Sequence, residues 1–166
     1  MNVTNIVAAD QIGRFPDANI GDAVKRIPGI TMQGDQGEAR NIVVRGMAPQ
    51  LNSVMINGDR VPSAEGDNRN IQMDLIPADM IQTIEVNKAV TPDMDADAIG
   101  GAVNLVTRPA PNGFRLSATA ASGVNLLTEK PIWTGSMILG NRFANNKLGV
   151  LVSATINDHD FGSDNM

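Results

Sequence analysis

The C-terminal third of the chain alternates regularly enough to constrain its fold. After Pro111, three segments of roughly ten residues carry apolar side chains at every second position, with small or polar side chains between them. These segments are FRLSATAA, WTGSMILG and LGVLVSATIND. Polar turns separate them, and no helical period follows. The alternation predicts antiparallel strands with one apolar face. It matches the pattern of transmembrane β-barrel strands, and it equally matches a soluble antiparallel meander.

The preceding residues mix helix and strand patterns. The segment NIGDAVKRIPGI predicts a short amphipathic helix, because its apolar residues recur at helical spacing. These residues are Ile20, Ala23, Val24 and Ile27. Asp17 or Asn19 can cap the start of this helix, and Pro28-Gly29 ends it. Further along, Asn57-Gly58 lies between two alternating runs and predicts a tight hairpin in which both turn residues have positive φ.

The remaining segments complete a small mixed domain. Strands are expected in ARNIVVRGM, TIEV and GGAVNLVTRP, which are rich in β-branched residues. Pro77 suits the first position of a short helix that ends before TIEV. The order helix, strand, hairpin, short helix, strand, strand therefore predicts an α+β domain that closes near Pro109.

Charge and composition exclude several classes of function. Lys and Arg number 13 against 18 Asp and Glu, a net charge of -5 without a basic stripe, so nucleic acid is not an expected partner. The absence of cysteine removes disulfides, thiolate zinc sites and cysteine nucleophiles. The start MNVTNIVAAD does not resemble a signal peptide. As given, the chain is expected to stay where it is made, as a soluble protein or as part of something longer.

The residues offer almost no support for catalysis. His159 is the only histidine, and the phosphate-binding and nucleophile-elbow glycine motifs are absent. A hydrolase that uses the aspartates of VTPDMDADAIGG would have to show metal-dependent turnover. We therefore expect no enzyme and no cofactor.

Asp93, Asp95 and Asp97 raise the question of a cation site. A calcium loop of the EF-hand type needs a glycine at its sixth position and an acidic residue at its twelfth, where this chain has Ala98 and Asn104. Three carboxylates can still hold a hard cation weakly. The pattern favours a structural role instead, in which Asp93 or Asp95 accepts backbone N–H groups of a short helical turn. No metal site is expected.

Several blocks together resemble the plug domain of TonB-dependent outer-membrane receptors. They are KRIPGI, IVVRGM, VMINGDRV and IQTIEVNKAVTPDMDADAIGGAVNLVTR. The resemblance covers about Phe15 to Pro109, and the alternating strands beyond it are similar to the start of the barrel. The phrases FPDANIGDAVKRIPGI and TPDMDADAIGGAVNLVTR resemble a subgroup of large receptors associated with carbohydrate uptake.

The resemblance implies an α+β fold of two parts. Residues 1–111 would be an N-terminally truncated plug domain, with short helices packed on a small β-sheet with a hairpin. Residues 112–166 would be about three antiparallel strands of an incomplete transmembrane β-barrel. Because three strands cannot close a barrel, we expect Phe114–Met166 to be poorly ordered or to pair edge to edge with another copy.

The resemblance also implies a function and partners. The parent protein would lie in the outer membrane of a Gram-negative cell and actively take up a small oligosaccharide or, failing that, an iron–siderophore. Its partners would be its own β-barrel, missing from this chain, and the energy-transducing protein TonB. The alternative is a stand-alone soluble periplasmic or secreted module that binds a ligand or partner and never enters a barrel.

Two sets of site residues follow from the resemblance. Arg45 and Lys88 match plug cations that face glutamates of the barrel wall in an ion-pair lock, although a lysine cannot make a two-point contact with a carboxylate. The alternative for both is an ordinary charge at a strand end.

Ligand contacts are expected from apical loops, namely Met47–Asn52, Pro62–Asn70 and the LIPAD turn. The candidate residues are Gln50, Asn52, Glu65, Asn68 and Arg69. The alternative here is a flexible solvated loop. Trp133 could stack on a sugar, but a lipid-facing or interfacial place is favoured.

Overall fold

The computed structural model describes residues 4–8, 19–35, 38–89, 92, 96, 98–125 and 129–158, with the backbone alone for residues 4–8. The chain divides into two compact units, Met1–Thr107 and Arg108–Met166, and each is described by itself. In the described parts, no helix is long and apolar enough to cross a membrane.

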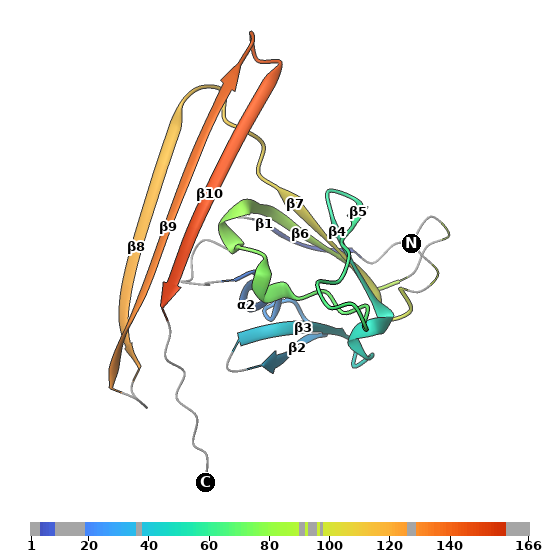
Figure 1. Cartoon of the computed structure of the whole chain (residues 1–166). Coiled ribbons are helices and arrows are strands. Elements are labelled where there is room, and N and C mark those ends of the chain that lie inside the picture. The colour runs from blue at the N-terminus through green and yellow to red at the C-terminus, as the bar shows by residue number, and fades with distance from the viewer. Residues whose placement is uncertain are drawn as a thin grey trace. The chain divides into compact units, whose positions relative to one another are not determined.

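The first unit is built on a five-stranded sheet in the order β1-β6-β7-β4-β5 (Figure 1). The strands are β1 (Thr4–Ala8), β4 (Asn52–Ile56), β5 (Asp59–Arg60), β6 (Ile81–Asn87) and β7 (Gly101–Thr107). The central strand β7 pairs antiparallel with β6 and parallel with β4. The last strand of the unit, β7, therefore lies between two strands that come earlier in the sequence.

A helix, a second hairpin and three short turns pack on this sheet. They are α2 (Ile20–Val24), β2 (Ile30–Asp35), β3 (Glu38–Val44), and the 3-10 turns η1 (Pro49–Leu51), η2 (Met73–Leu75) and η3 (Ala78–Met80). All four residues of the predicted apolar stripe are at most 1% exposed, but the helix is shorter than predicted, because it ends at Val24 and Ile27 lies in the turn after it. The four residues join one hydrophobic core with side chains of β3, β4, β6 and β7. Asn19 caps the helix by accepting from the Asp22 N–H at 3.2 Å, whereas Asp17 lies outside the described residues.

The predicted tight turn at Asn57-Gly58 is confirmed, with φ of 54° and 89° at the two residues. It joins β4 to β5, whose closing pair is Ile56 and Asp59.

The prediction of a short α-helix that begins at Pro77 is wrong. Pro77 is extended and precedes a single 3-10 turn, and β6 begins directly afterwards at Ile81. The β-branched residues of this segment pair with β7, and that pairing outweighs the helix-start chemistry of the proline.

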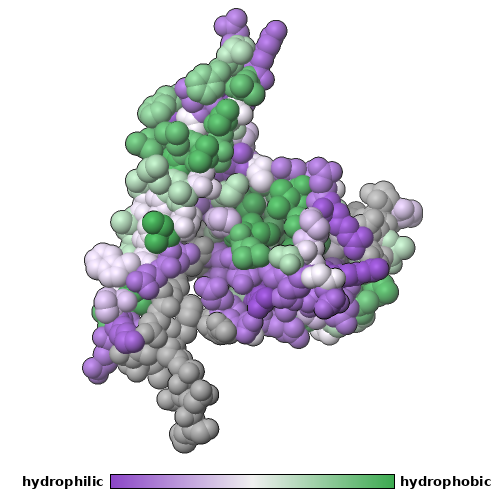
Figure 2. Space-filling view, viewed as in Figure 1, coloured by the Kyte–Doolittle hydropathy of each residue, from purple (hydrophilic) through white to green (hydrophobic). Residues whose placement is uncertain are grey.

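The second unit is an antiparallel sheet in the order β10-β9-β8. Its strands are β8 (Arg115–Asn125), β9 (Lys130–Phe143) and β10 (Leu148–Asp158). They pair in continuous register along their lengths, so the expectation of poor order is wrong for these three strands. Pairing with a second copy stays a prediction. Many apolar side chains of this sheet are exposed, including Trp133 at 59%, and Figure 2 shows hydrophobic side chains gathered along it.

Together the two units give the α+β class that the sequence predicted. Among the described residues, strands predominate, helices are few, and the small sheets do not close on themselves.

Candidate functional site

The loop between β5 and η2 is shaped by its own polar side chains. Ser63 Oγ accepts from the Glu65 N–H at 3.1 Å and donates to Asn68 Oδ1 at 3.2 Å. Asn68 Oδ1 also accepts from the Asn70 N–H at 3.0 Å. Gln72, which is 4% exposed, accepts from the Ala64 N–H at 3.1 Å. These local bonds pair polar groups of the loop with one another, and they favour a preorganised loop over a freely flexible one.

Arg40 ties this loop to the β2–β3 hairpin. Its guanidinium donates to the carboxylate of Asp35 on β2 and to that of Glu65 in the loop. Glu65 also accepts from the side-chain amide of Asn68. The hydrogen bond with Asp35 raises the pKa of the Arg40 guanidinium, and the negative charge of Glu65 acts in the same direction. Arg40 therefore remains a cation that joins two segments through charge-assisted bonds.

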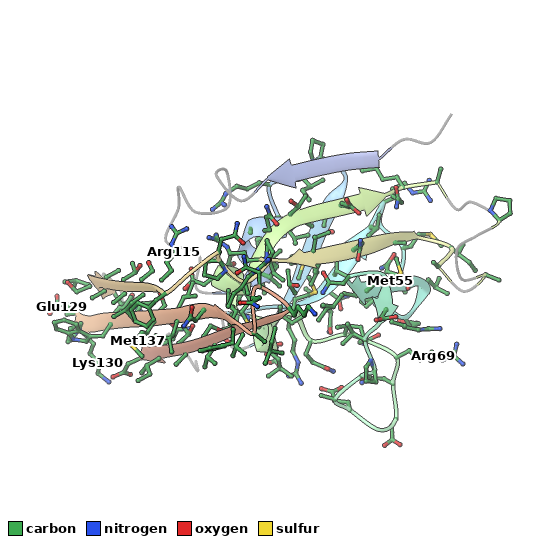
Figure 3. All side chains as sticks on the ribbon, turned by 90° about the horizontal axis from the view of Figure 1, so that it is seen from above. Met55, Arg69, Arg115, Glu129, Lys130 and Met137 are labelled. Atoms are coloured by element: carbon green, nitrogen blue, oxygen red, sulfur yellow. The ribbon has the colours of Figure 1, made fainter. Side chains whose placement is uncertain are left out.

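Two open hollows lie beside the loop. The first has a volume of about 580 Å³ and is lined by Gln33, Gly34, Asp35, Arg40, Asn41 and Glu65. The second has a volume of about 450 Å³ and is lined by Arg60, Val61, Pro62, Ser63, Asn68 and Arg69. The first lining contains two carboxylates and one guanidinium, whereas the second contains two guanidinium groups and no carboxylate. Figure 3 shows Arg69 projecting away from the sheet.

The structure brings three of the five candidate ligand contacts together in this loop: Glu65, Asn68 and Arg69. Gln50 lies exposed on η1. Asn52 is only 6% exposed, and its amide donates to the carbonyls of Ile42 at 3.0 Å and Ala48 at 3.3 Å. Because these donors are used inside the fold, Asn52 holds the connection between β3 and η1. The N–H groups of its side chain are therefore not available to a ligand.

The two residues expected in an ion-pair lock contact backbone carbonyls of their own unit. Arg45 donates to the Gly100 carbonyl from Nε at 3.2 Å and from Nη2 at 3.0 Å, and its Nη2 also donates to the Ile99 carbonyl at 3.3 Å. Lys88 Nζ donates to the Pro28 carbonyl. Pairing of either cation with a wall carboxylate stays a prediction.

Sequence reasoning missed Arg40 as a member of the site. Ile42 and Val44 are buried, and strict alternation would place Arg40 on their face. The register of β3 with β2 shifts beside Arg40, and Ala39 is buried instead, so the sequence pattern alone does not place Arg40 in the site. Nothing local in the sequence pairs it with Glu65, which lies 25 positions away. Asp93, Asp95, Asp97 and His159 lie outside the described residues, so the predictions made for them stay predictions.

Comparison with known proteins identifies the family. Residues 1–102 match the family model of the TonB-dependent Receptor Plug Domain. The chain belongs to this plug-domain family. The vitamin B12 transporter BtuB of Photobacterium profundum is 31% identical over 121 residues, which make up 72% of this chain and 20% of BtuB. The chain thus spans about a fifth of the length of this relative.

Solved structures show the same fold. A mutant of the ferric enterobactin receptor PfeA from Pseudomonas aeruginosa matches with a TM-score of 0.72 at 23% identity, over 93% of this chain and 24% of the receptor. The siderophore receptor PirA from Acinetobacter baumannii matches with a TM-score of 0.71 at 20% identity, over 93% of this chain and 24% of PirA. The plug resemblance is therefore confirmed, whereas the carbohydrate-associated subgroup is not supported. The three matched proteins are named as transporters or receptors.

Proposed function

We propose that this chain is the plug part of an outer-membrane receptor that takes up a ligand with energy delivered through TonB. The observation that carries the proposal is the match of residues 1–102 to the plug-domain family. The stand-alone module considered from the sequence is not favoured, because the relatives are transporters and receptors.

Within this proposal, residues 1–111 are the plug and residues 112–166 begin the surrounding barrel. A compact unit that ends at Thr107 supports the division. Further support comes from the length of the paired strands β8, β9 and β10 and from the exposed apolar residues along them. Spanning strands of a barrel have this length and this apolar outer face.

The ligand we propose is an anionic metal chelate or a cobalamin. The relatives are named for vitamin B12, for ferric enterobactin and as a siderophore receptor. Arg60 and Arg69 line the hollow beside the ordered loop, and guanidinium groups bind carboxylate, catecholate or phosphate oxygens in two-point geometry. Ser63 and Asn68 add neutral hydrogen-bonding groups to the same lining. A carbohydrate is the ligand that the subgroup resemblance favours, so oligosaccharides are included in the binding test.

The proposal is tested by binding to the full-length receptor. Ferric catecholate and ferric citrate chelates, cyanocobalamin and neutral oligosaccharides are titrated by calorimetry. We expect saturable binding of a chelate or of cobalamin. Arg69→Gln should weaken it roughly ten- to a hundredfold, because a charge-assisted hydrogen bond contributes about 1.5–3 kcal/mol.

Lys25→Gln is the matched control. Lys25 is another exposed cation of the same unit and pairs with Asp22 on the helix, so its loss should leave the affinity unchanged. Binding of neutral oligosaccharides alone, with Arg69→Gln without effect, would refute the proposed ligand class. Equal weakening by the two substitutions would refute the assignment to this hollow.

A further inference from the structure

Two cations hold the ends of the connection between β6 and β7. Lys88 directly follows β6, and its Nζ donates to the Pro28 carbonyl in the turn after α2. At the other end, Arg45 donates to the carbonyls of Ile99 and Gly100, immediately before β7. Each end of the connection is therefore attached to a different element through backbone oxygens.

The two attachments meet at one turn. The Arg45 N–H donates to the Gly29 carbonyl at 2.8 Å, next to the Pro28 carbonyl that Lys88 binds. Arg45 itself has a φ of 53°, a left-handed conformation that is disfavoured for a residue with a side chain. Such a conformation persists where the surrounding contacts require it. In Arg45, this backbone conformation occurs together with the guanidinium bonds to the residues just before β7.

The segment that Arg45 holds is also fixed from its other side. The Gly100 N–H donates to the Leu51 carbonyl at 2.9 Å. A Cβ at Gly100 would lie 2.0 Å from Asn52 Oδ1, so the Asn52 side chain fills the space beside this glycine. Both backbone polar groups of Gly100 are thus bonded, and little room remains for the segment to shift.

We propose that Arg45 is a positioning residue which, together with Lys88, clamps the base of the β6–β7 connection and sets where β7 begins. We call these contacts the carbonyl clamp: Arg45 on Ile99 and Gly100, and Lys88 on Pro28. Arg45 is the dominant half, because it makes three bonds where Lys88 makes one.

The clamp restricts what else Arg45 can bind. Its bonds use Nε and Nη2 and leave Nη1 as the one nitrogen with no bond to the described residues. A two-point contact with a carboxylate needs two neighbouring guanidinium nitrogens. Through Nη1 and Nη2, Arg45 can make such a contact only after Nη2 releases the Ile99 carbonyl, whereas its bonds to Gly100 can remain. The complete clamp and a two-point ion-pair lock therefore exclude each other. This consequence rests on the proposed plug function.

Amide hydrogen exchange of the 166-residue chain, measured by NMR, tests the clamp. In Arg45→Ala we expect the amides of Gly100 and Gly101 to exchange about tenfold faster, because the Gly100 carbonyl loses the bonds that hold it. In Arg45→Lys the exchange rates of these two amides should lie between those of the unaltered chain and those of Arg45→Ala, since an ammonium group cannot make the two parallel bonds of a guanidinium group. Amides in the middle of β6, such as Ile84, should keep their rates.

Arg40→Ala is the matched control, because it removes a guanidinium from β3 whose partners lie elsewhere. It should loosen the loop around Glu65 and leave Gly100 unchanged. Unaltered exchange at Gly100 in folded Arg45→Ala would overturn the clamp.

A second measurement needs no variant. Arg45 and Arg115 are both exposed, so the bond from Arg45 Nε to the Gly100 carbonyl should show as an Nε–H exchange about tenfold slower than that of Arg115 in the unaltered chain. Equal exchange at the two side chains would also overturn the proposal. Neither experiment uses a ligand or TonB, so a failed clamp and a failed transport function give separate results.

Discussion

Gly100→Ala is expected to destabilise the first unit by about 2–3 kcal/mol, the upper range for overpacking a filled site. The added Cβ would lie 2.0 Å from Asn52 Oδ1 and 3.0 Å from Met47 Cβ. Asn52 cannot easily move away, because its amide is bonded to the Ile42 and Ala48 carbonyls. The free energy of unfolding from urea titration, followed by circular dichroism, measures the effect.

Gly66→Ala is the matched control for this steric argument. No atom lies within 4 Å of a Cβ built at Gly66, so the same substitution should change stability by less than about 0.5 kcal/mol. A double-mutant cycle sharpens the test, because Gly100→Ala should cost less when Asn52→Ala has already removed the opposing side chain. Equal costs at Gly100 and Gly66, or an additive cycle, would show that Asn52 does not fill this space.

Leu105→Ala is expected to have the largest effect among the core positions, about 3–4 kcal/mol. Leu105 is fully buried on the central strand β7 and lies opposite Ile84 on β6 and Ile56 on β4. A cavity at this position removes contacts from three strands at once, and the paired backbone prevents them from closing it.

Leu75→Ala supplies the comparison of the same residue type in the same unit. Leu75 is 64% exposed on η2, and its truncation should cost less than about 1 kcal/mol. Thermal and urea unfolding of the two variants measure the loss of unfolding free energy at each position. Similar losses for Leu105 and Leu75 would contradict the assignment of β7 to the centre of the core.

Local patterns were sufficient to predict many elements of the fold. The Asn57-Gly58 turn follows from backbone sterics at those two residues, and the buried stripe of α2 follows from helical spacing. The strands of the second unit follow from alternation alone, since β10 covers the predicted segment LGVLVSATIND. Each of these features depends on residues that are close in sequence.

Contacts between distant residues were beyond sequence reasoning. The parallel pairing of β4 with β7 joins segments about fifty residues apart, and no local pattern specifies it. The same holds for Arg45, whose partners lie 54 and 55 positions away. Its motif suggests a cation that faces glutamates of the barrel wall, whereas in this chain its guanidinium donates to backbone carbonyl oxygens.

Polar residues illustrate the same limit at the candidate site. Asn52 is a reasonable ligand contact by composition, but its side-chain N–H groups donate to backbone carbonyls of its own fold. Glu65 and Asn68 are predicted ligand contacts, with a flexible solvated loop as the alternative, and in the structure they belong to a network that Arg40 anchors to the β2–β3 hairpin. The partners that distinguish a structural amide from a binding amide become visible only in three dimensions.

Ligand accumulation by cells that carry the full-length receptor tests the proposed transport function most directly. Labelled ferric chelate or cyanocobalamin is supplied to Gram-negative cells with and without TonB, and label inside the outer membrane is separated from label bound at the surface. We predict surface binding in both strains and accumulation only where TonB is present. Equal accumulation in the two strains would contradict the account.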